Sequence, residues 1–101
     1  MAHIKIPFKK EFRQALLDGK KTKTSRNKKY GDLGDTFDIF DGVFKITAIE
    51  KQPLEKVATQ WYAEEGCDSP AAIRDIWIKL HPIKGFEAVK DVFVHTFTRI
   101  E

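Results

Sequence analysis

The chain has 101 residues and a mass of 11.7 kDa, the size of a single domain with one compact core. Hydrophobic residues make up 42% and charged residues 33%, ordinary proportions for a soluble globular protein. No apolar run approaches the about 20 residues of a membrane span, and no signal-peptide pattern opens the chain. The single cysteine, Cys67, excludes an internal disulfide framework, so we expect a cytoplasmic protein without membrane contact. The histidines and Cys67 lack metal-ligand spacing, so we expect no metal and no other cofactor.

The net charge of +3 is unevenly distributed along the chain. Residues 1–30 contain ten lysines or arginines and two acids, whereas residues 31–101 contain eight basic and thirteen acidic residues. The segment 20–29 carries six positive charges and no negative one, a pattern that attracts phosphate or another anion. On composition alone, a solvated lysine-rich surface is an equally good interpretation.

The first part of the chain predicts a strand, a helix and a second strand. Apolar residues alternate over residues 3–8, which is the period of a strand, and Pro7 favours a sheet edge or a strand end. Helical spacing of apolar residues predicts a helix over residues 9–18 that ends at Gly19. β-Branched threonines favour a strand over residues 21–26.

The rest of the chain predicts a hairpin, two helices and a closing strand. Asp41-Gly42 between two apolar alternations is a signal for a two-residue hairpin turn. Ser69 as N-cap and Pro70 at the first helical position predict a helix start. The predicted elements are strands over 36–40 and 43–50, helices over 53–65 and 70–80, and a strand over 91–100. This order predicts one α+β domain, in which a small mixed sheet curls toward a barrel plugged by helices.

The stretch from Gly19 to Arg26 is the most informative part of the sequence. It combines a helix stop, a cationic turn and a short strand that carries hydroxyl groups. Lysine and arginine suit a phosphate or a base edge, and an activated threonine can act as a nucleophile. Three residues apart on a regular strand, Lys21 and Thr24 would face opposite ways. If they act together, Lys21 must lie in the turn before the strand, and its pKa must be lowered by burial or by neighbouring positive charge.

The motif Gly19-x-Lys21-x-x-Thr24-x-Arg26 resembles the G-x-K-x-x-x-x-R motif of ASCH domains, which belong to the PUA-like superfamily. The resemblance covers nearly the whole chain. Its other parts are Phe12, Leu16 and Leu17 before the motif, Gly34-Asp35 before a strand, the helical section 61–82, and the closing strand 93–97. It implies a small β-barrel with helices and a cleft that binds RNA or nucleotides.

One subgroup of small bacterial ASCH proteins hydrolyses the amide of N4-acetylcytidine. In that subgroup a motif threonine is the nucleophile, a motif lysine is the base, and a glutamate from the later helical section assists. By their positions in the motif, Thr24 and Lys21 match the first two of these residues, the threonine and the lysine. The family glutamate aligns with Gly66, so that Glu65 or Glu64 would have to take its place.

Two functional hypotheses follow, with RNA or a modified pyrimidine nucleoside as the partner. The first is a binding module, and the second is an amidohydrolase that deacylates N4-acylated cytidine. A protein-binding domain that uses the acidic C-terminal part has only the charge asymmetry in its favour. Tyr30 could stack on a base or anchor its loop. The residues expected to bind the ligand are Lys20, Lys21, Lys23, Arg26, Lys28, Lys29 and Tyr30; those expected in catalysis are Lys21, Thr24, Glu65 and Glu64.

Overall fold

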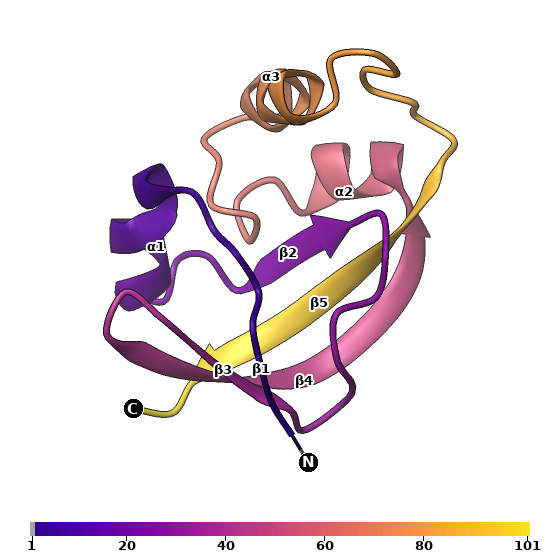
Figure 1. Cartoon of the computed structure of the whole chain (residues 1–101). Helices are drawn as coiled ribbons and strands as arrows, with labels where there is room; N and C mark the ends of the chain where they lie inside the picture. Colours follow the sequence, from indigo (N-terminus) through magenta and orange to yellow (C-terminus); the bar gives the residue numbers. More distant parts are fainter. Residues whose placement is uncertain (1) are drawn as a thin grey trace.

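A computed structural model describes residues 2–101 and confirms the predicted order of elements (Figure 1). None of its helices is both long enough and apolar enough to cross a membrane. The elements are β1 (His3–Ile4), the 3₁₀ helix η1 (Lys10–Phe12), α1 (Arg13–Leu17), β2 (Lys23–Arg26), β3 (Thr36–Ile39), β4 (Gly42–Pro53), α2 (Leu54–Gln60), α3 (Pro70–Leu80) and β5 (Asp91–Arg99).

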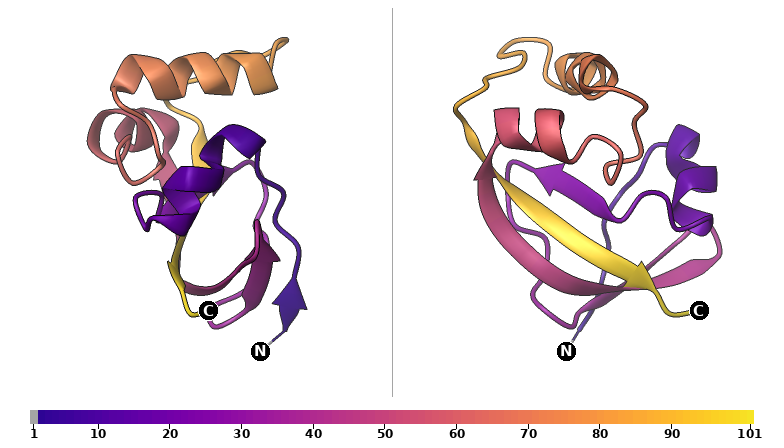
Figure 2. Two further views of the ribbon diagram at one scale, coloured as in Figure 1. Left: turned by 90° about the vertical axis from the view of Figure 1, so that its left-hand side faces the viewer. Right: turned by 180° about the vertical axis from the view of Figure 1, so that it is seen from behind.

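All five strands belong to one mixed sheet in the order β1-β3-β4-β5-β2. β1 is parallel to β3, and the other pairs are antiparallel. The sheet is strongly curved, with β1 and β2 as its edges (Figure 2). Within residues 2–101 no backbone ladder joins these edges. Instead, Arg26 Nη2 donates a hydrogen bond of 2.6 Å to the carbonyl of Pro7, just after β1. The predicted α+β fold with a mixed, curled sheet is therefore confirmed.

Two apolar clusters hold the helices against the sheet. The first fills the concave side, where the Phe37 and Phe44 rings stack at 5.4 Å and Phe97 packs edge-on against both. The second lies between α2, α3 and β5, with Leu54 and Trp77 among its buried members. α2 and α3 lie together at one end of the sheet, and α1 lies apart from them (Figure 1). Residues from both clusters line a pocket beside β2.

Three predicted elements are shorter in the structure. Strand pairing of residues 3–8 stops after Ile4, and Pro7, which has no N–H to donate, lies in the unpaired segment before η1. The helix predicted over 9–18 splits into η1 and α1, although Gly19 takes the expected left-handed φ of 78°. The helix predicted over 53–65 ends at Gln60, because the chain then turns back toward β2.

The predicted hairpin between β3 and β4 is present, but its turn lies one residue earlier. Ile39 pairs with Gly42, and the two turn residues are Phe40 and Asp41, with φ values of 51° and 69°. A Cβ atom on Gly42 would lie 3.0 Å from the Phe44 ring. The glycine therefore leaves room for the Phe44 ring beside it in β4 and is not a turn residue.

Replacing the fully buried Phe37 with alanine should lower the free energy of unfolding by about 3–5 kcal/mol, because it leaves a cavity in the aromatic cluster. Urea denaturation measures this loss. Ile83→Ala is the control, since Ile83 is 96% exposed and should change stability by less than about 0.5 kcal/mol. Equal losses in both variants would contradict the assigned core.

Candidate functional site

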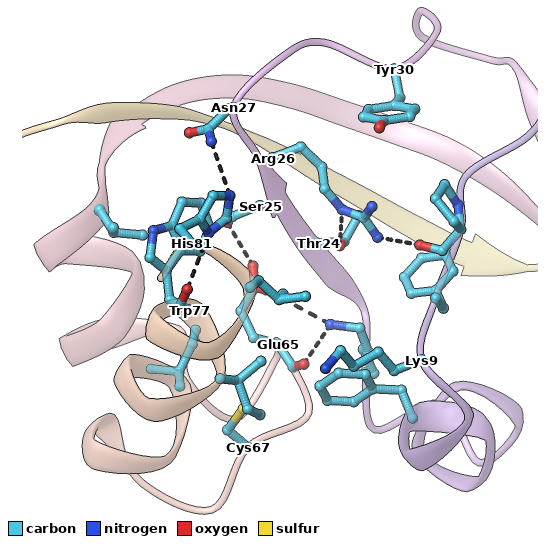
Figure 3. Close-up of a pocket in the computed structure, with 18 of the residues that line it drawn as sticks. Lys9, Thr24, Ser25, Arg26, Asn27, Tyr30, Glu65, Cys67, Trp77 and His81 are labelled. Carbon is cyan, nitrogen blue, oxygen red and sulfur yellow. Dashed lines mark hydrogen bonds and ion pairs between the residues drawn. The ribbon is translucent and has the colours of Figure 1, made fainter. Parts of the chain in front are cut away.

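A pocket of about 570 Å³ opens beside β2, between the segment 7–12 and α3 (Figure 3). Its polar side comes from β2, from Lys21 just before it, and from Glu65. Its apolar side includes Leu54, Ile73 and Trp77. This volume lies within the range that holds small ligands. Among residues 2–101, no group of three metal-ligating side chains comes together.

Lys21 lies in the turn before β2, as expected, and its side chain is buried, with the residue only 4% exposed. Its ammonium group donates to the carbonyl of Glu65 at 2.5 Å and to the carbonyl of Lys23 at 3.0 Å. The Glu65 Oε1 atom lies 3.7 Å from Nζ, and the centre of the Phe12 ring lies 4.5 Å away. All of these neighbours favour a cation.

The environment of Lys21 affects its pKa in two opposing ways. Burial lowers the pKa of Lys21 below that of an exposed lysine, while the charge of Glu65 raises it, and the net direction is downward. Lys21 therefore gives up its proton more readily than a surface lysine. A lysine that acts as a base at this position needs a lowered pKa of this kind.

Glu65 is the glutamate that the fold brings to Lys21. It is 6% exposed, and its Oε2 atom accepts a hydrogen bond of 2.7 Å from Ser25 Oγ. One carboxylate thus connects the ammonium of Lys21 with a hydroxyl of β2. Glu64 is outside the pocket lining and contributes its backbone carbonyl, which accepts hydrogen bonds from the N–H groups of Thr22 and Lys23.

Gly66, the position that aligns with the family glutamate, packs directly against the Lys21 stem. Its φ is +91°, and an added Cβ atom would lie 3.2 Å from both Lys21 Cβ and Phe12 Cδ1. A side chain at this position would be strained and crowded. The carboxylate that lies beside the Lys21 ammonium belongs to the preceding residue, Glu65.

Thr24 and Ser25 direct their hydroxyl groups to opposite sides of β2 (Figure 3). Thr24 is 4% exposed, and its Oγ1 atom accepts a hydrogen bond of 3.0 Å from Arg26 Nε. Among residues 2–101, no hydrogen bond joins Thr24 to Lys21. The guanidinium of Arg26 also lies over the rings of Phe8 and Tyr30, at 5.1 and 5.5 Å from their centres.

The remaining predicted binding residues divide between the pocket and other surfaces. Lys28 lines the pocket, with its Nζ atom 5.0 Å from the centre of the Tyr30 ring. Lys23 points elsewhere, to Thr96 Oγ1 at 2.8 Å and over the Trp61 ring. Lys29 forms an ion pair with Asp32, and Lys20 is outside the lining. The predicted residues that the fold brings together are Lys21, Thr24, Arg26, Lys28, Tyr30 and Glu65.

Several residues that line the pocket were not singled out by sequence reasoning. The strand period places Ser25 on the face of β2 opposite Thr24, and Glu65 lies on that face. Phe8 and Phe12 are apolar positions in the sequence pattern, and in the structure their rings face Arg26 and Lys21. The available signal was the pair of acids Glu64 and Glu65 before a glycine, together with a hydroxyl inside the motif.

His95 fixes the strand and loop that carry this site. It is fully buried, and its Nε2 atom accepts a hydrogen bond of 2.9 Å from the backbone N–H of Tyr30. The proton must therefore be on Nδ1, which lies 3.1 Å from the carbonyl of Thr24 and donates to it. Burial lowers the pKa of His95, and the nearby charge of Arg26 acts in the same direction.

Comparison with known proteins identifies the fold. No family model and no curated protein sequence matches the chain. Among solved structures, an ASCH domain from Lactobacillus crispatus JV V101 superposes with a TM-score of 0.65 and 14% identity, covering 97% of this chain and 77% of that one. At this identity the likeness concerns the fold alone: the chain has the fold of an ASCH domain, as its sequence motif predicted.

Two further structures share this fold. The protein EF3133 from Enterococcus faecalis V583, assigned to a domain family of unknown function, has a TM-score of 0.65 and 16% identity, covering 89% of this chain and 67% of that one. The hypothetical protein PH0355 has a TM-score of 0.70 and 14% identity, covering 92% and 94%.

The stability of the protein should fall as the pH drops below about 6.5, the ordinary pKa of histidine. The pKa of His95 is lowered in the folded state, so the unfolded chain takes up the proton first and is favoured by acid. The part of this loss in the free energy of unfolding that comes from His95 should not exceed about 1.4 kcal/mol per pH unit. Urea denaturation at pH 7.5 and 5.5 should show a smaller loss for His95→Gln than for the wild type or for His3→Gln. The same loss in all three proteins would contradict this role.

Proposed function

We propose that the chain is an ASCH domain whose pocket binds a pyrimidine nucleoside or nucleotide, either free or within RNA. The observation that carries this proposal is the convergence of the motif residues Lys21, Thr24 and Arg26 on one pocket together with Tyr30. Aromatic rings and an apolar wall suit a planar base. The cations Arg26 and Lys28 suit a phosphate near the pocket mouth.

The placement of the other lysines favours a single nucleotide over a long RNA segment as the main ligand. Lys23 is held by Thr96 and Trp61, and Lys29 is held by Asp32. A long RNA segment would need a continuous track of available cations. The structure offers Arg26 and Lys28 at the pocket, and Lys9 also lines it.

Lys28→Ala should weaken the binding of cytidine 5′-monophosphate about fivefold, the effect of losing one partly exposed charge contact. It should also make the binding less sensitive to salt concentration, because salt screens the lost charge contact. Isothermal titration calorimetry at three salt concentrations measures both. Lys29→Ala is the matched control and should bind like the wild type. Identical behaviour of the two variants, or no binding by the wild type, would reject the assignment.

Amide hydrolysis is the second candidate function, and one specific observation favours it. The Lys21–Glu65 pair is buried beside two hydroxyl groups, although burying such a pair stabilises a fold little, if at all. A base with a lowered pKa next to a hydroxyl is the equipment of nucleophilic catalysis. The ASCH resemblance supplies the substrate, N4-acetylcytidine, with Thr24 as the nucleophile and Lys21 as the base.

Wild-type protein should release cytidine from N4-acetylcytidine at neutral pH, followed by liquid chromatography. Lys21→Met and Glu65→Gln should each reduce the rate at least about a hundredfold, the usual contribution of an acid–base group. Lys23→Met is the matched control, because that lysine lies two residues along the chain and points away from the pocket. If the folded wild type releases no cytidine, hydrolysis of this substrate is excluded and the binding function stands alone.

A further inference from the structure

Two neighbouring hydroxyl groups line the pocket, and only one of them is joined to a base. Ser25 Oγ lies 2.7 Å from Glu65 Oε2, and both residues are buried. Thr24 Oγ1 instead accepts a hydrogen bond from Arg26. A guanidinium donates protons in hydrogen bonds and does not act as a base at neutral pH, whereas a carboxylate can take a proton from a hydroxyl.

We infer that Ser25 is the nucleophile of this pocket, with the carboxylate of Glu65 as its base. This inference rests on the proposed hydrolytic function and changes its key assignment from Thr24 to Ser25. Ser25 lies on the side of β2 that faces Glu65 and Trp77 (Figure 3). An acyl group that reaches Ser25 would therefore meet the apolar side of the pocket, which suits its hydrocarbon part.

A purely structural role does not account for the bond between Ser25 and Glu65. Backbone contacts already attach this segment to the start of β2, because the N–H groups of Thr22 and Lys23 both donate to the carbonyl of Glu64. The Lys21 ammonium adds a third contact, to the carbonyl of Glu65. The carboxylate is thus not required for docking, yet it is kept out of water, which is unfavourable for a charge.

The contacts define a complete reaction path. The Ser25 hydroxyl proton passes to Glu65 Oε2 while Oγ bonds to the acyl carbon. The carbon–nitrogen bond of the amide then breaks, and the proton on Glu65 passes to the leaving amine nitrogen. Water then attacks the acyl carbon of the Ser25 ester and gives a proton to Glu65; the bond between that carbon and Oγ breaks, Glu65 returns the proton to Oγ, and the acid is released. Lys21, with Nζ 3.7 Å from Glu65 Oε1, holds the carboxylate in place and is a positioning residue.

The test is to map the acyl group on the protein after brief exposure to p-nitrophenyl acetate, by peptide mass spectrometry. We expect an acetyl ester on Ser25 that hydroxylamine removes, unlike the acetyl amides of surface lysines. Glu65→Gln should reduce this ester at least tenfold. Thr98→Ala, which changes an exposed strand threonine outside the pocket, should retain it. An acetyl ester on Thr24 and none on Ser25 would overturn the inference.

Cytidine release from N4-acetylcytidine separates this inference from the function on which it rests. We expect Ser25→Ala to lower the rate at least a hundredfold, with Thr98→Ala unchanged. Near wild-type turnover in Ser25→Ala would overturn the role of Ser25 and leave the hydrolase standing. An ester on Ser25 without cytidine release would retain the nucleophile and reject the substrate. If Ser25→Ala does not fold, Ser25→Cys replaces it, and a thioester at the same position gives the answer.

Discussion

The ammonium of Lys21 and the carboxylate of Glu65 lie out of water next to each other, and neither could stay there charged without partners. Their contacts reach the main elements around the pocket. Lys21 connects η1, through the Phe12 ring, with the strand β2. Glu65 brings the turn after α2 against the same strand. Removing either partner would leave a buried charge uncompensated, so the pocket and its charge pair form together.

The edge strand β2 and the segment that follows the other edge strand, β1, both contribute to this pocket. Arg26 spans from β2 to the carbonyl of Pro7, where a closed sheet would have a backbone ladder. A side chain can bridge a wider gap than a backbone hydrogen bond, and it leaves room for a ligand between the edges. The same guanidinium binds Thr24 and covers the Phe8 and Tyr30 rings. The opening in the sheet and the candidate binding site are therefore one feature.

The sequence predicts those parts of the site that depend on local geometry. A helix stop at Gly19 places Lys21 in a turn, and the strand period places Thr24 and Arg26 on one face. The partners of these residues are distant in the chain and could not be read locally. Ser25 and Glu65 are 40 residues apart, and the choice of Glu65 depends on the crowding around Gly66.

The contacts of the lysines, too, could not be predicted from the sequence. Lys28 and Lys29 are adjacent lysines that the sequence alone does not distinguish. Lys28 lines the pocket, whereas Lys29 forms an ion pair with Asp32. Lys23 lies inside the motif but outside the site, because its ammonium contacts Thr96 Oγ1 and the Trp61 ring instead. A run of positive charge therefore indicates an anion-binding region without identifying which of its members take part.

The contacts of the Lys23 backbone have a consequence for the behaviour of the molecule in a crowded solution. β2 is an edge strand, and an exposed edge offers free N–H and C=O groups to the strands of other molecules. In this protein the N–H of Lys23 donates to Glu64, and its C=O accepts from the Lys21 ammonium. The groups that build the candidate site thus also occupy the N–H and C=O of Lys23 that an added strand would need, and loss of the Lys21 side chain would free that C=O.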